Sequence, residues 1–181
     1  LAVIGDVCGK GAEAASLTAM ARHTLRTLAR HHDRPGPVLE AANEAIAGQL
    51  PEGRFCTVAA AALEPGADGL RVTVAIAGHP VPIVVRGTGE VALLGRAGML
   101  LGVFDELGVV EQDVVLAAGD ALVLFTDGCV GEGADSLQVL GACLAATAGQ
   151  SAAAMAEAVE TTAVELEGDH RDDMAILVVK A

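Results

Sequence analysis

Hydrophobic and polar residues follow a helical period in some parts of the chain and form short β-prone runs in others. Residues 1–4 are apolar and lead into a glycine-rich loop, after which residues 12–32 carry apolar side chains at helical spacing. This pattern predicts a strand, a loop and a long helix. Pro-Gly-Pro at 35–37 predicts the end of that helix, and helical periodicity returns over residues 38–50.

The middle of the chain is rich in β-prone residues, punctuated by glycine and proline. Six such runs occur, at 55–63, 70–77, 81–86, 91–94, 109–116 and 121–126. Helical segments at 136–148 and 151–167 then precede a last β-prone run at 174–179. Six successive strands imply antiparallel pairing, and helix pairs on both sides of them predict an α+β domain in which helices cover stacked sheets. An open, doubly wound fold is disfavoured.

Length, charge and cysteine content narrow the class of protein. The 181 residues predict a single domain spanning 1–181, and no stretch of about 18 apolar residues suggests a membrane segment. Twenty-four acidic against eleven basic residues give a net charge of -13, which argues against nucleic acid as a partner. The four cysteines form neither CxxC nor zinc-ligand spacing, so a reduced, cytoplasmic location is expected.

Aspartates follow or precede apolar runs in three separate parts of the chain. They are Asp6, Asp127, and the pair Asp172 and Asp173. If these strands are neighbours, the carboxylates converge at one edge of a sheet, where their repulsion requires a countercharge. Oxygen-only ligands suit a hard divalent ion, Mg²⁺ or Mn²⁺. The alternative is that each aspartate simply caps a turn, as in Asp127-Gly128.

The glycine-rich loop, Gly-Asp-Val-Cys-Gly-Lys-Gly at 5–11, is not a known nucleotide cradle. Ile4 and Gly11 stand where a Walker A loop requires glycine and Ser or Thr, and the dinucleotide fingerprint is also absent. An acidic residue at a strand end, flexible backbone and one lysine remain. Lys10 is interpreted as a solvated surface charge, with a phosphate contact as the alternative.

Four segments together resemble a known family. They are residues 5–11, residues 77–82 (Ala-Gly-His-Pro-Val-Pro), residues 118–120 with 125–128, and residues 172–174. Their order is similar to that of the PPM family of metal-dependent serine/threonine phosphatases, most of all to its bacterial SpoIIE-type (RsbU-like) branch, which includes regulators of alternative sigma factors. The likeness runs from Ile4 to Val179. It implies a four-layer αββα sandwich of antiparallel sheets covered by helix pairs, with N-terminal strands missing from this chain.

The resemblance also implies a role for each aspartate. Asp6 would bridge two Mn²⁺ or Mg²⁺ ions, the Val7 carbonyl would bind one of them, and Asp127 and Asp172 would complete the other. Asp173 is a neighbour and the alternative ligand. Two such ions would lower the pKa of a bridging water and clamp a phosphoryl group for in-line attack, without a phosphoenzyme. Asp6, Asp127 and Asp172 are therefore the predicted catalytic residues.

The chain departs from the family pattern at two places. Cys8 stands where eukaryotic type 2C relatives have histidine and the SpoIIE-type branch usually has serine, so we expect solvent to protonate the leaving group. The family's acidic motif on an upstream strand is not in this sequence. One metal site would therefore be incomplete, and an uncovered sheet edge suggests weak metal occupancy and a homodimer contact.

The resemblance implies hydrolysis of phosphoserine or phosphothreonine on a regulatory protein, such as an antagonist of an anti-sigma factor, in the bacterial cytoplasm. Two alternatives stay open: a catalytically weak or silent docking or dimerisation module, and a hydrolase of another phosphoester. His79, in Ala-Gly-His-Pro, is interpreted as a structural residue of a turn, with an acid, base or ligand role as the alternative.

Overall fold

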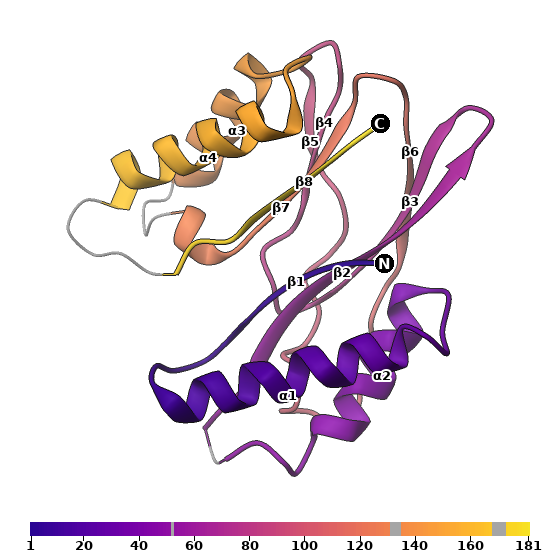
Figure 1. Ribbon diagram of the computed structural model, residues 1–181, viewed down its shortest axis with the longest axis vertical. Coiled ribbons are helices and arrows are strands. Elements are labelled where there is room, and N and C mark those ends of the chain that lie inside the picture. The colour runs from indigo at the N-terminus through magenta and orange to yellow at the C-terminus, as the bar shows by residue number, and fades with distance from the viewer. Residues whose placement is uncertain (52, 131–134, 168–172) are drawn as a thin grey trace. The chain divides into compact units, whose positions relative to one another are not determined.

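The computed structural model of the chain describes residues 1–51, 53–130, 135–167 and 173–181 (Figure 1). It contains two four-stranded sheets, and the chain divides into two compact units. The first unit comprises residues 1–63, 72–79 and 95–113, and the second comprises residues 64–71, 80–94 and 114–181.

The first sheet has the strand order β1-β2-β3-β6. Its strands are β1 (Ala2–Val7), β2 (Cys56–Gly66), β3 (Gly69–Ala77) and β6 (Gln112–Leu116). Helices α1 (Ala12–Leu28) and α2 (Pro35–Ile46) bury their apolar faces with the strands in one aliphatic core. In α1 the buried Leu17, Ala21 and Leu25 recur every four residues, as one face of a helix requires.

The second sheet has the order β5-β4-β7-β8. Its strands are β4 (Ile83–Val85), β5 (Val91–Leu93), β7 (Ala121–Phe125) and β8 (Ile176–Lys180), and the pairs β4-β5, β4-β7 and β7-β8 are antiparallel. A short 3-10 helix, η1 (Asp127–Cys129), follows β7. Helices α3 (Ser136–Ala146) and α4 (Ala152–Glu167) form a core with this sheet. Every residue of β7 is buried, and Ala121, Val123 and Phe125 belong to that core.

The α+β prediction and the order of elements are confirmed, but some boundaries were wrong, most clearly the start of α2. The Pro-Gly-Pro sequence does not separate the helices: α2 begins at Pro35. Proline is tolerated in the first turn of a helix because its missing N–H would have no intrahelical partner there. The N–H of Gly36 is bonded instead by Glu111 Oε1 at 2.8 Å, so a residue far along the chain caps this helix. Strands β4 and β6 are also shorter than the runs that predicted them.

A buried carboxylate connects two loops of the second unit. Asp120 accepts hydrogen bonds from Arg86 Nη1 at 2.7 Å, from Gly87 N–H at 2.8 Å and from Ala117 N–H at 3.0 Å. Burial by itself raises the pKa of Asp120, but the hydrogen bonds from Arg86, Gly87 and Ala117 and the charge of Arg86 outweigh burial and hold that pKa below its usual value. Asp120 therefore stabilises the fold in its ionised form.

We expect Asp120→Asn to lower the free energy of unfolding by about 1–3 kcal/mol at pH 7, because a charged acceptor of three hydrogen bonds is lost. The pKa of Asp120 is lower in the folded state, so its contribution is complete above the ordinary carboxyl pKa of about 4 and disappears as the pH falls through the folded-state pKa. Urea unfolding of both proteins between pH 7 and pH 3 measures this. A difference that stays constant with pH would contradict the assignment, and exposed Asp68→Asn is the control.

Candidate metal centre

Asp6 lies near the end of β1, where the strand is held closely against β2. The two strands pair antiparallel from Ala2 opposite Ala61 to Val7 opposite Cys56, and Asp6 stands opposite Thr57. Gly5 permits this approach, because a Cβ there would be 2.5 Å from the carbonyl oxygen of Thr57. The Asp6 side chain is exposed, so its carboxylate is accessible from solvent. The packing of the strand thus fixes the backbone that carries the first candidate ligand.

Arg54 holds the glycine-rich loop that follows Asp6. Its Nη1 donates to the carbonyl oxygen of Cys8 at 2.9 Å, and its Nη2 forms an ion pair with Glu13 Oε2 at 3.0 Å in the first turn of α1. Gly9 has φ +113°, and a Cβ there would be 1.6 Å from Arg54 Nη1. The backbone conformation therefore favours glycine at position 9, and a side chain there would displace the guanidinium that bonds Cys8. No pattern in the sequence indicated this role of Arg54.

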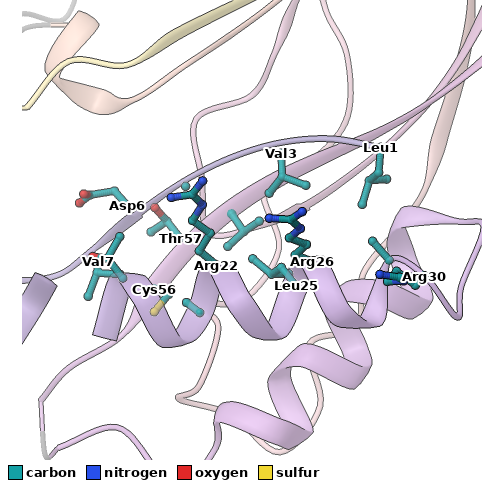
Figure 2. A pocket seen from close by; sticks show the side chains of 15 residues that line it. Leu1, Val3, Asp6, Val7, Arg22, Leu25, Arg26, Arg30, Cys56 and Thr57 are labelled. Carbon is teal, nitrogen blue, oxygen red and sulfur yellow. The ribbon is translucent and has the colours of Figure 1, made fainter. Parts of the chain in front are cut away.

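A groove of about 500 Å³ lies between β1, β2 and α1, with Asp6 towards one end and Leu1 at the other (Figure 2). Two exposed arginines one helical turn apart on α1, Arg22 and Arg26, line it together with the exposed Arg30, which follows the end of the helix. β1 is the end strand of its sheet in the described part of the chain, and the predicted uncovered edge stays a prediction. The homodimer expected from that edge stays a prediction.

The negative charge of Asp6 affects Cys56 in the neighbouring core. Cys56, on β2, is buried, and burial together with the negative charge of Asp6 raises the pKa of its thiol to about 11. Cys56 is therefore protonated at neutral pH and is a poor metal ligand. The donors near Asp6 that suit a hard divalent ion are oxygens.

The other two candidate ligands that the structure describes, Asp127 and Asp173, lie at adjoining strand ends of the second sheet. β7 and β8 pair with Phe125 opposite Ile176, so the end of one strand adjoins the start of the other. The buried Thr126 connects them: its Oγ1 donates to the carbonyl oxygen of Asp173 at 3.1 Å and accepts from the N–H of Ala175 at 2.9 Å. Asp127, at the start of η1, and Asp173 are both exposed.

The predicted ligands are thus divided between two sheets. Asp127 and Asp173 flank neighbouring strands, as expected, whereas Asp6 lies on the first sheet, so the arrangement at one edge of a single sheet is not found. Asp172 lies outside the described residues. Among the residues that are described, no group of three or more His, Cys, Asp or Glu side chains could hold a metal ion. Exposed carboxylates at strand ends fit a hard divalent ion chemically, but the meeting of Asp6 with Asp127 and the Val7 carbonyl stays a prediction.

His79 and Lys10 lie where their structural interpretations place them. His79 directly follows the turn at Gly78, is only 2% exposed, and has its Nδ1 2.9 Å from Thr57 Oγ1. Lys10 is exposed in the loop. Thr57 lies opposite Asp6 on the neighbouring strand and bonds His79, and no pattern in the sequence indicated this role.

Comparison with known proteins identifies the family. The sequence profile described as Stage II sporulation protein E (SpoIIE) matches residues 1–181. The chain belongs to the SpoIIE family. This confirms the resemblance drawn from the glycine loop and the aspartate motifs. A comparison with curated protein sequences found no relative of this SpoIIE-family chain.

Solved structures share its fold. The RsbU and RsbW domains of Rv1364c from Mycobacterium tuberculosis match with a TM-score of 0.80 at 26% identity, over 98% of this chain and 50% of that one. The SiaA-PP2C domain of Pseudomonas aeruginosa matches with a TM-score of 0.76 at 23% identity, over 99% of this chain and 74% of that one. The PP2C phosphatase domain with a regulatory fragment of SpoIIE from Bacillus subtilis matches with a TM-score of 0.79 at 16% identity, over 98% and 53%.

These matches confirm the predicted PPM phosphatase fold. The SpoIIE-family chain spans about half the length of the Mycobacterium tuberculosis and Bacillus subtilis chains that it matches. Among the described helices, none combines the length and apolar character needed to cross a bilayer.

Proposed function

We propose that residues 1–181 form one phosphatase domain that hydrolyses phosphoserine or phosphothreonine on a regulatory protein, using Mn²⁺ or Mg²⁺. The observation that carries this proposal is the match of the SpoIIE family to the whole chain. Accessible carboxylates at the strand ends, on Asp6 and Asp127, support it because carboxylate oxygens suit a hard divalent ion and the resemblance to the family implies that these two are ligands. The neighbour from Mycobacterium tuberculosis combines RsbU and RsbW domains, which supports a regulatory role in the bacterial cytoplasm, with an antagonist of an anti-sigma factor as substrate.

In this mechanism Asp6, the Val7 carbonyl, Asp127 and Asp172 would hold two ions, with Asp173 as the alternative to Asp172. Bound ions supply positive charge that makes water more acidic and stabilises the charge of a transferring phosphoryl group. The chain's own residues position these ligands: pairing with β2 fixes the backbone of Asp6, and Thr126 fixes the segment beside Asp127.

The leaving group has no evident protein acid in the glycine loop. Cys8, which takes the place of the histidine of type 2C relatives, is half-buried, and its carbonyl oxygen is occupied by Arg54. A thiol is a weak hydrogen-bond donor. We therefore propose that solvent protonates the serine or threonine oxygen as it leaves.

A docking or dimerisation module is the second candidate. It is favoured by one observation, the groove beside β1, an end strand among those described, lined by Arg22, Arg26 and Arg30. An end strand offers unpaired backbone groups to another chain, and the three arginines would attract acidic side chains. In that case Asp6 and its neighbours would serve stability rather than catalysis.

Phosphate release by the full chain separates these functions. The substrates are synthetic phosphoserine and phosphothreonine peptides, with a phosphotyrosine peptide and ATP as comparisons, each with Mn²⁺ and with EDTA. We expect release from the first two only, and only with Mn²⁺. Preferential release from ATP would favour a hydrolase of another phosphoester. An inactive protein that forms a stable dimer would favour the docking module.

A further inference from the structure

Three polar side chains form a row across the first sheet, from Asp6 through Thr57 to His79. Asp6 and Thr57 are directly opposite in the antiparallel pair β1-β2, so their side chains leave the same face with Cβ atoms about 4.5–5.5 Å apart. Figure 2 shows both side chains at the same end of the groove. β3, which leads to His79, pairs with the opposite edge of β2. Thr57 therefore lies between the aspartate and the imidazole.

The backbone around His79 brings its ring back onto the sheet. Gly78 has φ +64°, a conformation that favours glycine, and it forms a parallel bridge with Val58 on β2. A Cβ at position 78 would be 2.5 Å from Leu100 Cδ2. The bridge to Val58 and the contact with Leu100 thus hold the turn on two sides. The buried imidazole of His79 that follows it has its Nδ1 2.9 Å from Thr57 Oγ1.

The direction of that hydrogen bond decides what Thr57 can offer Asp6. A threonine hydroxyl has one hydrogen and two lone pairs, whereas an ionised carboxylate only accepts. If Thr57 donates to Nδ1, only lone pairs remain for the side of Asp6, and they repel the carboxylate. If the imidazole donates from Nδ1, the Thr57 hydrogen is available to Asp6.

We propose that His79 is a positioning residue for Asp6 and acts through Thr57: the imidazole carries its proton on Nδ1, donates it to Thr57 Oγ1, and leaves the hydroxyl hydrogen for the Asp6 carboxylate. Hydrogen bonds from neighbouring groups orient metal-binding carboxylates and raise the affinity of the site. This inference rests on the proposed function, because it takes Asp6 as a metal ligand.

The test is the dissociation constant of Mn²⁺ for the full chain, measured by titration calorimetry without substrate. Thr57→Val keeps the shape of the side chain and removes the hydroxyl, so we expect Mn²⁺ to bind about 10–100-fold more weakly. Thr57→Ser keeps the hydroxyl and should bind close to wild type. Thr73→Val is the matched control, since it removes another hydroxyl of the same sheet, bonded to Asp113 Oδ1 at 2.6 Å, and should leave Mn²⁺ affinity unchanged.

A second measurement does not depend on any variant folding. Nitrogen-15 NMR of the wild-type imidazoles should show His79 as the neutral tautomer protonated on Nδ1, and a tautomer protonated on Nε2 overturns the proposal. Unchanged Mn²⁺ affinity in folded Thr57→Val also overturns it, while leaving the proposed function intact. A wild-type chain that binds no Mn²⁺ overturns both the inference and the proposed function.

Discussion

Asp127→Asn should lower Mn²⁺-dependent phosphate release from a phosphoserine peptide by about 1,000-fold, because a metal site supplies several kcal/mol of transition-state stabilisation and each 1.4 kcal/mol is a factor of ten. The substitution removes one charge and keeps the size of the side chain. Asp127 Oδ1 accepts a hydrogen bond from the N–H of its neighbour Gly128 at 3.1 Å, a local contact that the asparagine Oδ1 can keep, so the loss should act on the site rather than on the fold. Initial rates at saturating Mn²⁺ measure the effect.

The control for this variant is Asp68→Asn. Asp68 is also exposed, lies in the turn between β2 and β3, and is not among the predicted ligands. It should retain wild-type activity. An Asp127→Asn protein that keeps more than about a tenth of the activity would leave Asp127 with less than 1.4 kcal/mol of the barrier, which is too little for a metal ligand.

Phe125→Ala should lower the free energy of unfolding by about 3–5 kcal/mol, the usual cost of removing a buried aromatic ring. Phe125 ends β7, is 1% exposed, and belongs to the core that α3 and α4 share with the second sheet. It is also two residues before Asp127, so its loss should disturb the strand end that positions this aspartate. Urea unfolding followed by far-ultraviolet circular dichroism is the appropriate measurement, since the chain has no Trp or Tyr.

Phe104→Ala provides the comparison for the same chemical change. Phe104 is 43% exposed, although its carbonyl oxygen accepts from Asn43 Nδ2 at 2.7 Å. The backbone contact survives the substitution, so we expect a loss below about 1 kcal/mol, as for most surface changes. Equal losses for Phe125→Ala and Phe104→Ala would show that the second core is not packed as described.

Much of the fold could be predicted because its signals are local. The spacing of Leu17, Ala21 and Leu25 predicts α1, and the run that ends at Phe125 predicts β7. The start of α2 was predicted wrongly because its cap is not local. Glu111, 75 residues from Gly36, bonds the free N–H of the first turn, and no pattern around Pro35 contains that information.

In the candidate site too, residues with local sequence signals could be predicted, whereas residues whose roles depend on distant contacts could not. Asp6, Asp127 and Asp173 could be chosen as candidate ligands from the sequence because each adjoins an apolar run and matches a family motif, and the structure places Asp127 and Asp173 at adjoining strand ends. Arg54 and Thr57 were missed because their roles depend on pairing between β1 and β2, about 50 residues apart. Arg54 belongs to no recognisable sequence motif, and Thr57 lies in a β-prone run in which threonine is common.

A crystal structure of the full chain with Mn²⁺, using the anomalous signal of the metal, would show whether Asp6 and Asp127 share a metal centre. We expect anomalous density coordinated jointly by the carboxylates of Asp6 and Asp127, with Asp172 or Asp173 as a further ligand. Manganese bound elsewhere, or Asp6 and Asp127 too far apart to share a metal centre, would contradict this expectation.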